Sequence, residues 1–168
     1  MKLTSLKFIS FAITFLLFSF PLLSMEQVND IPIGRYLIKS RPCCGFLCDD
    51  RGARLKSSIS KKSVFIFEKR AEGFLIKNYY NHSYLNSSTP SRSSYASISS
   101  FANDIKSESY YHIFKKDGAY VIKSEKFSDY LTTNGISEEG NYLFLENEIY
   151  NLEYRNSYFI FQNFDFDF

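Results

Sequence analysis

The sequence has no tryptophan, only two histidines and three cysteines, and few runs of strong helix formers. After the first 24 residues, no window of about 12 residues has apolar side chains at the spacing of an amphipathic helix, and no apolar run is long enough to span a bilayer. A nucleophile elbow, a glycine-rich phosphate loop and a four-ligand zinc pattern are also missing. These absences argue against a helical fold, and we expect neither catalysis nor a cofactor or metal.

Charge of one sign is also lacking overall. The chain holds 20 basic and 18 acidic side chains, and removal of the first 24 residues with their two lysines leaves 18 of each. This balance argues against nucleic acid as a general partner.

The charge is nevertheless unevenly distributed. Residues 35–62 hold eight basic and two acidic side chains, while residues 138–168 hold one basic and seven acidic side chains. One interpretation of the basic segment is a patch for an anionic glycan or a lipid headgroup, carried by Arg51, Arg54, Lys61 and Lys62. The simpler alternative is a solvated face.

The N-terminal segment has the pattern of a secretory signal peptide. Lys2 and Lys7 precede the apolar stretch "FISFAITFLLFSFPLLS", which serines and a proline interrupt. This pattern predicts cleavage near Ser24 or Met25 and a secreted chain; the alternative is an uncleaved membrane anchor. Residues 25–168 have the length of one domain.

Aromatic residues are what the sequence has in excess, with 18 Phe and 13 Tyr. Aromatic and β-branched side chains favour pleated, half-buried surfaces, so the composition predicts an all-β fold.

Three related segments recur: "GRYLIKS" at 34–40, "GFLIKN" at 73–78 and "GAYVIKS" at 118–124. Nine residues after the isoleucine of each comes a leucine that follows an aromatic residue: Leu47, Leu85 and Leu131. A third element, "FIFEK", "HIFKK" or "FIFQN", places Phe67, Phe114 and Phe161 at intervals of 47 residues. We therefore expect these three phenylalanines to be equivalent core positions of stacked or symmetric units.

Each unit is expected to contain four short strands, with its third strand near residues 55–60, 94–101 or 142–146. The units span about 31–70, 71–117 and 118–164. Three units of four strands favour a closed barrel, which leaves no free sheet edge.

The Gly-aromatic-x-Ile opening, the Tyr-Leu second strand and the Phe-rich closing strand resemble the β-trefoil superfamily over residues 31–164. Within it, "YLTTNGISEEGNYLFLEN" at 130–147 is similar to a hairpin of ricin-B-type lectin domains, and "FIFQNF" resembles their closing Gln-x-Trp signature with Phe164 in the Trp place. Only the third unit has the glutamine, since Glu68 and Lys115 occupy its place in the others.

The ricin-type resemblance implies that a sugar binds between a carboxylate after the second strand, an aromatic ring on the third and an amide before the fourth. In the first unit Asp50 matches the carboxylate, but no aromatic residue follows until Phe65. In the third unit the matching residues are Asn134, Tyr142 and Asn147, or Asn151 in place of the last.

The second unit offers Asn86 and Tyr95 for the same roles. The alternative interpretation is that Asp50 and Asn134 form turns beside Gly52 and Gly135, and that the tyrosines pack or face water. We expect a non-enzymatic protein that binds a carbohydrate or glycoconjugate, mainly through the third unit.

A second resemblance leads to a different function. "GFLCDDRGARLKSS" at 45–58 is similar to a hairpin of fibroblast growth factors. It implies a growth-factor-like ligand that binds a receptor or a sulfated glycan, and a trefoil-type protease inhibitor is a further alternative.

Two covalent modifications are also expected. Cys43 and Cys44 each lie close enough in sequence to Cys48 to form a disulfide in a secreted chain, which leaves one thiol over. "NHS" and "NSS" make Asn81 and Asn86 candidate glycosylation sites in a eukaryotic host.

Overall fold

The computed structural model describes residues 25–42, 45–50, 52–87, 99–133, 139–146 and 157–166. The described residues form thirteen strands and two single turns of 3-10 helix, Lys61–Ser63 and Ser107–Ser109, which confirms the all-β prediction. The first seven strands are β1 (Glu26–Gln27), β2 (Tyr36–Ser40), β3 (Phe46–Asp49), β4 (Ala53–Lys56), β5 (Val64–Arg70), β6 (Gly73–Asn78) and β7 (Tyr84–Asn86). The others are β8 (Ser100–Ala102), β9 (Tyr110–Lys116), β10 (Ala119–Ser124), β11 (Tyr130–Thr133), β12 (Glu139–Glu146) and β13 (Phe159–Asn163).

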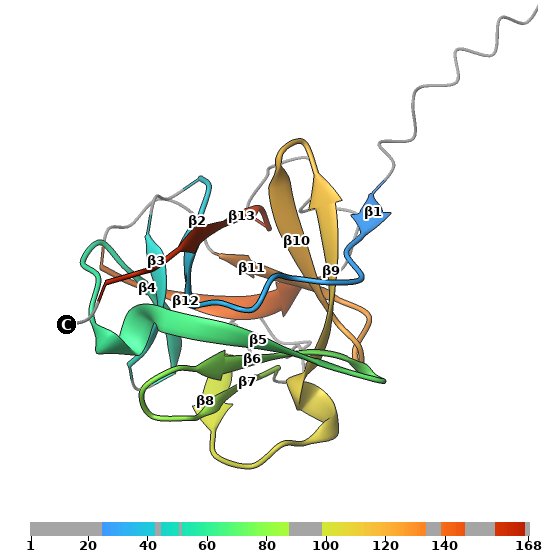
Figure 1. Cartoon of the computed structure of the whole chain (residues 1–168), viewed down its shortest axis with the longest axis horizontal. Coiled ribbons are helices and arrows are strands. Elements are labelled where there is room, and N and C mark those ends of the chain that lie inside the picture. The colour runs from blue at the N-terminus through green and yellow to red at the C-terminus, as the bar shows by residue number, and fades with distance from the viewer. Residues whose placement is uncertain are drawn as a thin grey trace, which may run out of the picture.

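Six of the strands form a closed antiparallel barrel (Figure 1). Its ring runs from β2 to β5, β6, β9, β10 and β13, and the pairing of β13 with β2 closes it. Closure leaves no free edge among these strands, so every one of them has two hydrogen-bonded neighbours.

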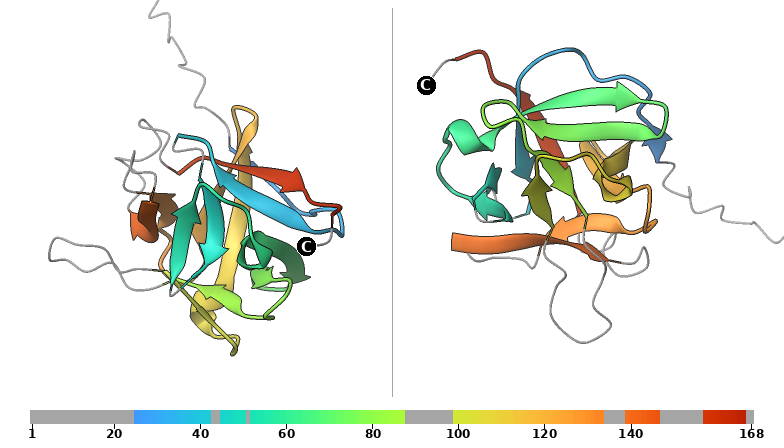
Figure 2. Two further views of the ribbon diagram at one scale, coloured as in Figure 1. Left: turned by 90° about the vertical axis from the view of Figure 1, so that its left-hand side faces the viewer. Right: turned by 90° about the horizontal axis from the view of Figure 1, so that it is seen from below.

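Three hairpins extend from one end of this barrel: β3–β4, β7–β8 and β11–β12 (Figure 2). β12 also pairs with β4, opposite Leu55 and Arg54. The strands predicted near 55–60 and 142–146 exist, but each begins earlier than expected, at Ala53 and Glu139. Of the segment predicted at 94–101, the described part begins a strand at Ser100.

The core lies where the barrel meets the hairpins. Its aliphatic residues include the three isoleucines of the repeated segments and the leucines that follow nine residues later. All six are fully buried in one cluster: Ile38, Leu47, Ile76, Leu85, Ile122 and Leu131. The nine-residue spacing found in the sequence therefore marks equivalent core positions.

The expected equivalence of Phe114 with Phe67 and Phe161 is wrong. Phe67 lies opposite Ile76 and Phe161 lies opposite Ile38, but the residue opposite Ile122 is Ile113. Ile113 is fully buried. All three phenylalanines are half-buried, but Phe67 and Phe161 pack against the central core, whereas Phe114 lies in a separate cluster with Val121, Tyr130 and Tyr158. Fully buried rings occupy the next inward position of each strand: Phe65, Tyr111 and Phe159.

The register counted from the turn accounts for this one-residue shift. Phe67 lies three residues before Arg70, which pairs with Gly73 across a two-residue turn, and the residue three before Lys116 is Ile113. Lys116 pairs with Ala119 across Asp117 and Gly118, which both have positive φ, at 50° and 72°. Such a two-residue turn fixes the hairpin register, and a slip of one residue moves a side chain to the other face of the sheet. Phe114 therefore faces away from the position that sequence similarity assigned to it.

Residues 28–35 cross the barrel end opposite the hairpins before they enter β2 (Figure 1). The Val28 amide donates to the Ile113 carbonyl at 2.8 Å, and Ile31 packs against Tyr36, Phe74 and Ile113. Within the described ranges there is no helix of the length and apolarity needed to cross a membrane.

Candidate functional site

Asp50, the carboxylate expected to bind sugar in the first unit, is held by two lysines. One oxygen accepts from Lys56 Nζ and the other accepts from Lys62 Nζ at 3.0 Å. These hydrogen bonds lower the pKa of Asp50 to about 2. Because both oxygens are engaged by ammonium groups, Asp50 mainly ties the residues after β3 to the β4 end and the following turn.

The expected basic patch is only partly available to an anion. Lys62 is paired with Asp50, Lys61 Nζ lies 5.6 Å from the centre of the Tyr80 ring, and Arg54 is half-buried in β4. Arg51 lies outside the described residues. The patch therefore stays a prediction, with one of its cations already neutralised.

The third-unit site remains a prediction for a different reason. Asn134 and Asn147 lie outside the described residues. Of Tyr142, in β12, the structure describes only the backbone, which pairs with Arg54 of β4.

The cysteine and glycosylation predictions have separate outcomes. Cys48 carries a free thiol that is 1% exposed, and Cys43 and Cys44 lie outside the described residues, so the expected bridge to Cys48 is not shown. Asn81 is exposed, and its Nδ2 donates to Asp49 at 2.6 Å. Asn86 is 8% exposed and accepts a hydrogen bond from Ser109 Oγ, a position in the folded chain with little room for a glycan.

The second unit contains an open pocket of about 380 Å³. We call it the side pocket, and its lining residues are Asn86, Ser87, Ser100, Ala102, Lys106, Glu108, Lys126 and Phe127. Asn86 ends β7, Ser100 and Ala102 belong to β8, and Lys106 and Glu108 precede β9. Six of the eight lining residues thus lie around the second, third and fourth strands of the second unit, where the resemblance leads us to expect a sugar.

The polar groups of the side pocket are held in fixed positions. Glu108 accepts from Lys126 Nζ and from Ser107 Oγ, and Lys126 is the main cause of the lowered pKa of Glu108. The Ser87 amide donates to the Glu108 carbonyl at 2.9 Å, and Ser87 Oγ donates to the buried Tyr111 hydroxyl at 3.1 Å. The pocket therefore presents an ion pair and hydroxyl groups on a rigid frame.

Sequence reasoning identified Asn86 in this region but missed Lys126 and Phe127. These two residues come from the turn between β10 and β11, in the next unit of the chain. Lys126 Nζ lies 5.3 Å from the centre of the Phe127 ring. Nothing in the sequence pattern signals that this turn lies beside β7 and β8.

Within the described part of the chain, no group of three or more His, Cys, Asp or Glu side chains is placed to hold a metal ion. His112 Nε2 pairs with Glu125, and its Nδ1 lies 3.4 Å from the Gln27 amide nitrogen.

No protein-family model matches the sequence, and no curated protein matches it. Solved structures do resemble the fold. A ricin B-like lectin from Macrolepiota procera, in complex with lactose, has a TM-score of 0.66 at 14% identity, over 80% of this chain and 99% of the lectin. The designed threefold-symmetric protein ThreeFoil has a TM-score of 0.65 at 12% identity, over 78% and 99%.

A lectin from Polyporus squamosus, bound to a human-type influenza-binding epitope, has a TM-score of 0.62 at 13% identity. The match covers 80% of this chain, which spans only 50% of the lectin. Identities this low establish the architecture and leave the ligand open. With the closed barrel and its three hairpins, these likenesses show that the chain has a β-trefoil fold.

Proposed function

We propose that this protein is a secreted, non-enzymatic β-trefoil that binds a carbohydrate or glycoconjugate in the side pocket. The observation that carries the proposal is the location of this pocket, between β7, β8 and the segment before β9. The similar structures include lectins solved with lactose and with a sialylated epitope, which supports a glycan as the class of ligand.

The chemistry of the pocket suits a sugar. Vicinal hydroxyl groups need paired donors and acceptors, which the Glu108 carboxylate and the Lys126 ammonium group supply side by side. Phe127 is half-buried at the same wall and offers an apolar surface for the C–H face of a ring. Lys106 is exposed at the rim and would favour a glycan that carries a carboxylate or sulfate.

The finer parts of the proposal follow from the sequence. The mature chain, residues 25–168, is one domain of three pseudo-symmetric units with four strands each. Asn134, Tyr142 and Asn147 form a second binding position at the β11–β12 hairpin.

A glycan array probed with the refolded mature chain tests the proposal. Ser100 is exposed on β8, so Ser100→Arg should fill the side pocket without disturbing the core and should remove the glycan retention that this pocket provides. Ser57→Arg adds the same side chain at an exposed position after β4 and serves as the matched control.

Tyr142→Ala separates the two positions, since it should weaken only the retention that survives in Ser100→Arg. Retention that neither substitution reduces would contradict both sites. Mass spectrometry of the retained glycans should show them unchanged, and cleavage products would contradict a non-enzymatic role.

A further inference from the structure

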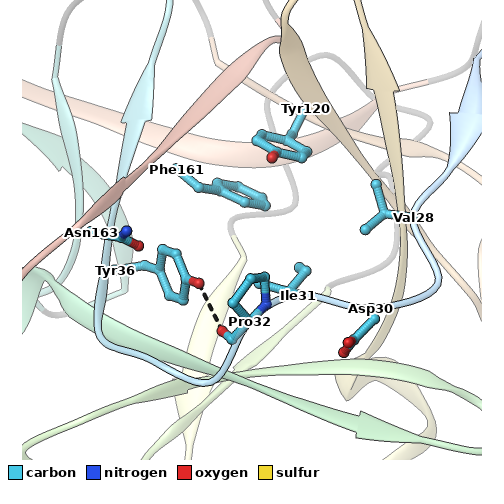
Figure 3. A pocket seen from close by; sticks show the side chains of 8 residues that line it. All are labelled: Val28, Asp30, Ile31, Pro32, Tyr36, Tyr120, Phe161 and Asn163. Atoms are coloured by element: carbon cyan, nitrogen blue, oxygen red, sulfur yellow. Dashed lines mark hydrogen bonds between the residues drawn. The ribbon is translucent and has the colours of Figure 1, made fainter.

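A second pocket, of about 280 Å³, lies at the barrel end away from the hairpins (Figure 3). We call it the barrel-end pocket, and its lining residues are Val28, Asp30, Ile31, Pro32, Tyr36, Tyr120, Phe161 and Asn163. Tyr36 begins β2 and pairs with Asn163, the last residue of β13. The barrel-end pocket and the side pocket share no lining residue, so they are separate sites.

Aromatic rings form one wall of the barrel-end pocket. Tyr120 and Phe161 stack with ring centres 4.1 Å apart and planes 3° apart, and Phe161 also contacts Phe67 at 4.7 Å. Tyr36 meets Phe67 edge-on at 5.5 Å, and its hydroxyl donates to the Pro32 carbonyl at 2.7 Å. Interlocked rings of this kind hold their positions, so the wall is formed before any ligand arrives.

The opposite wall carries the only charge in the pocket lining. Figure 3 shows Val28 and Asp30 across the pocket from Tyr36. No basic side chain lines the pocket, and among the described residues no ion pair or hydrogen bond engages the Asp30 carboxylate. Asp30 nevertheless acts on the pocket interior, because its charge, after burial and Tyr120, raises the pKa of Tyr36.

We propose that the barrel-end pocket binds a small, free organic ammonium compound with an apolar or aromatic body. The ammonium group pairs with the Asp30 carboxylate at the rim, and the body lies between Val28 and Ile31 on one side and Tyr120 and Phe161 on the other. A charge-assisted pair at the edge of an apolar cavity supplies both orientation and affinity.

Other ligand classes fit less well. An anion meets the uncompensated Asp30 carboxylate. A sugar needs several donors and acceptors, but the Tyr36 hydroxyl already donates to Pro32, which leaves mainly the Tyr120 hydroxyl and the Asn163 amide as side-chain donors of the lining.

Three probes with one aromatic body test the charge preference: 2-phenylethylammonium, 2-phenylethanol and 3-phenylpropionate. Each is titrated into the mature chain to about 10 mM while amide NMR shifts are followed, a range that covers the millimolar affinities of small ligands. We expect saturable shifts around residues 28–36, 120 and 161, strongest for the ammonium, weaker for the alcohol and weakest for the carboxylate.

Asp30→Asn should weaken ammonium binding about tenfold, equivalent to roughly 1.4 kcal/mol, and leave the alcohol almost unchanged. Asp104→Asn removes the same charge from an exposed position after β8 and should bind like the parent. Equal affinity for all three probes, equal binding by Asp30→Asn and the parent, or no saturable shift would each overturn the proposal. Both variants change an exposed side chain, so both should fold like the parent, and an unchanged thermal unfolding curve verifies this.

Discussion

Ile113 lies directly opposite Ile122 in the β9–β10 hairpin, and both side chains are fully buried. Phe67 lies opposite Ile76 in the same way in the β5–β6 hairpin, where Ile76 is fully buried and Phe67 is half-buried. Such pairs of facing residues fix which side chains of a hairpin point into the shared core. In the β9–β10 hairpin the side chain that points inward is therefore Ile113 and not Phe114.

The first prediction concerns this register. Ile113→Ala should lower the free energy of unfolding by about 2–5 kcal/mol, because it removes a fully buried aliphatic side chain. Phe114→Leu keeps an apolar group on a half-buried face and should lower it by less than about 1.5 kcal/mol. Urea unfolding followed by tyrosine fluorescence measures both. If Phe114→Leu lowered the free energy of unfolding more than Ile113→Ala, then Phe114 and not Ile113 would be the core residue equivalent to Phe67.

The second prediction concerns the close approach of β6 to β9. Gly73 has a φ of 145°, and a Cβ atom there would lie 2.7 Å from the Tyr111 carbonyl oxygen. Gly73→Ala should therefore combine backbone strain with a backbone clash and destabilise the fold by about 2–3 kcal/mol or more.

Gly118→Ala is the matched control for this substitution. Gly118 also has a positive φ, of 72°, but nothing lies within 4 Å of a Cβ atom built there. It should cost only the strain of the left-handed conformation, about 1 kcal/mol. Equal melting temperatures for the two variants would show that β6 and β9 are not in close contact.

The third prediction concerns acid sensitivity. The pKa of Asp50 is lowered from 3.8 to about 2, first by the hydrogen bond from Lys56 and then by that from Lys62. A carboxyl group whose pKa is lower in the folded state stabilises the protein above its unfolded pKa, and this contribution disappears as the pH falls towards the folded value. The parent should therefore lose stability more steeply than Asp50→Asn between pH 3.8 and 2.

Thermal unfolding at a series of pH values measures this difference. The ion pairs of Asp50 with Lys56 and Lys62 are partly exposed to solvent, so high salt should screen both and make the difference between the two proteins smaller. Parallel pH profiles of the parent and Asp50→Asn, at low salt, would mean that neither lysine holds the carboxylate in solution.

Much of the fold could be predicted because it depends on short-range patterns. Strands are favoured by local composition and by the alternation of apolar side chains. In each unit, the buried leucine of the second strand follows the buried isoleucine of the first by nine residues. Ile38 and Leu47 therefore identified their counterparts in the other units correctly. The position of Ile113 was also available, by counting outward from the Asp117–Gly118 turn, but letter similarity favoured Phe114.

The candidate sites could be predicted only in part, because they join residues that are distant in sequence. The resemblance to ricin-type repeats pointed to Asn86, which ends β7, but only the folded chain brings Lys126 and Phe127 to it. The barrel-end pocket likewise needs Asp30, Tyr120 and Phe161 together. The sequence by itself determined the β-class and the repeated isoleucine and leucine positions, since these follow from local composition and spacing, and its motifs carried the resemblance to trefoils. Tertiary structure alone decided the side-chain partners and the cavities, because closing the barrel sets the distances between segments that no local pattern relates.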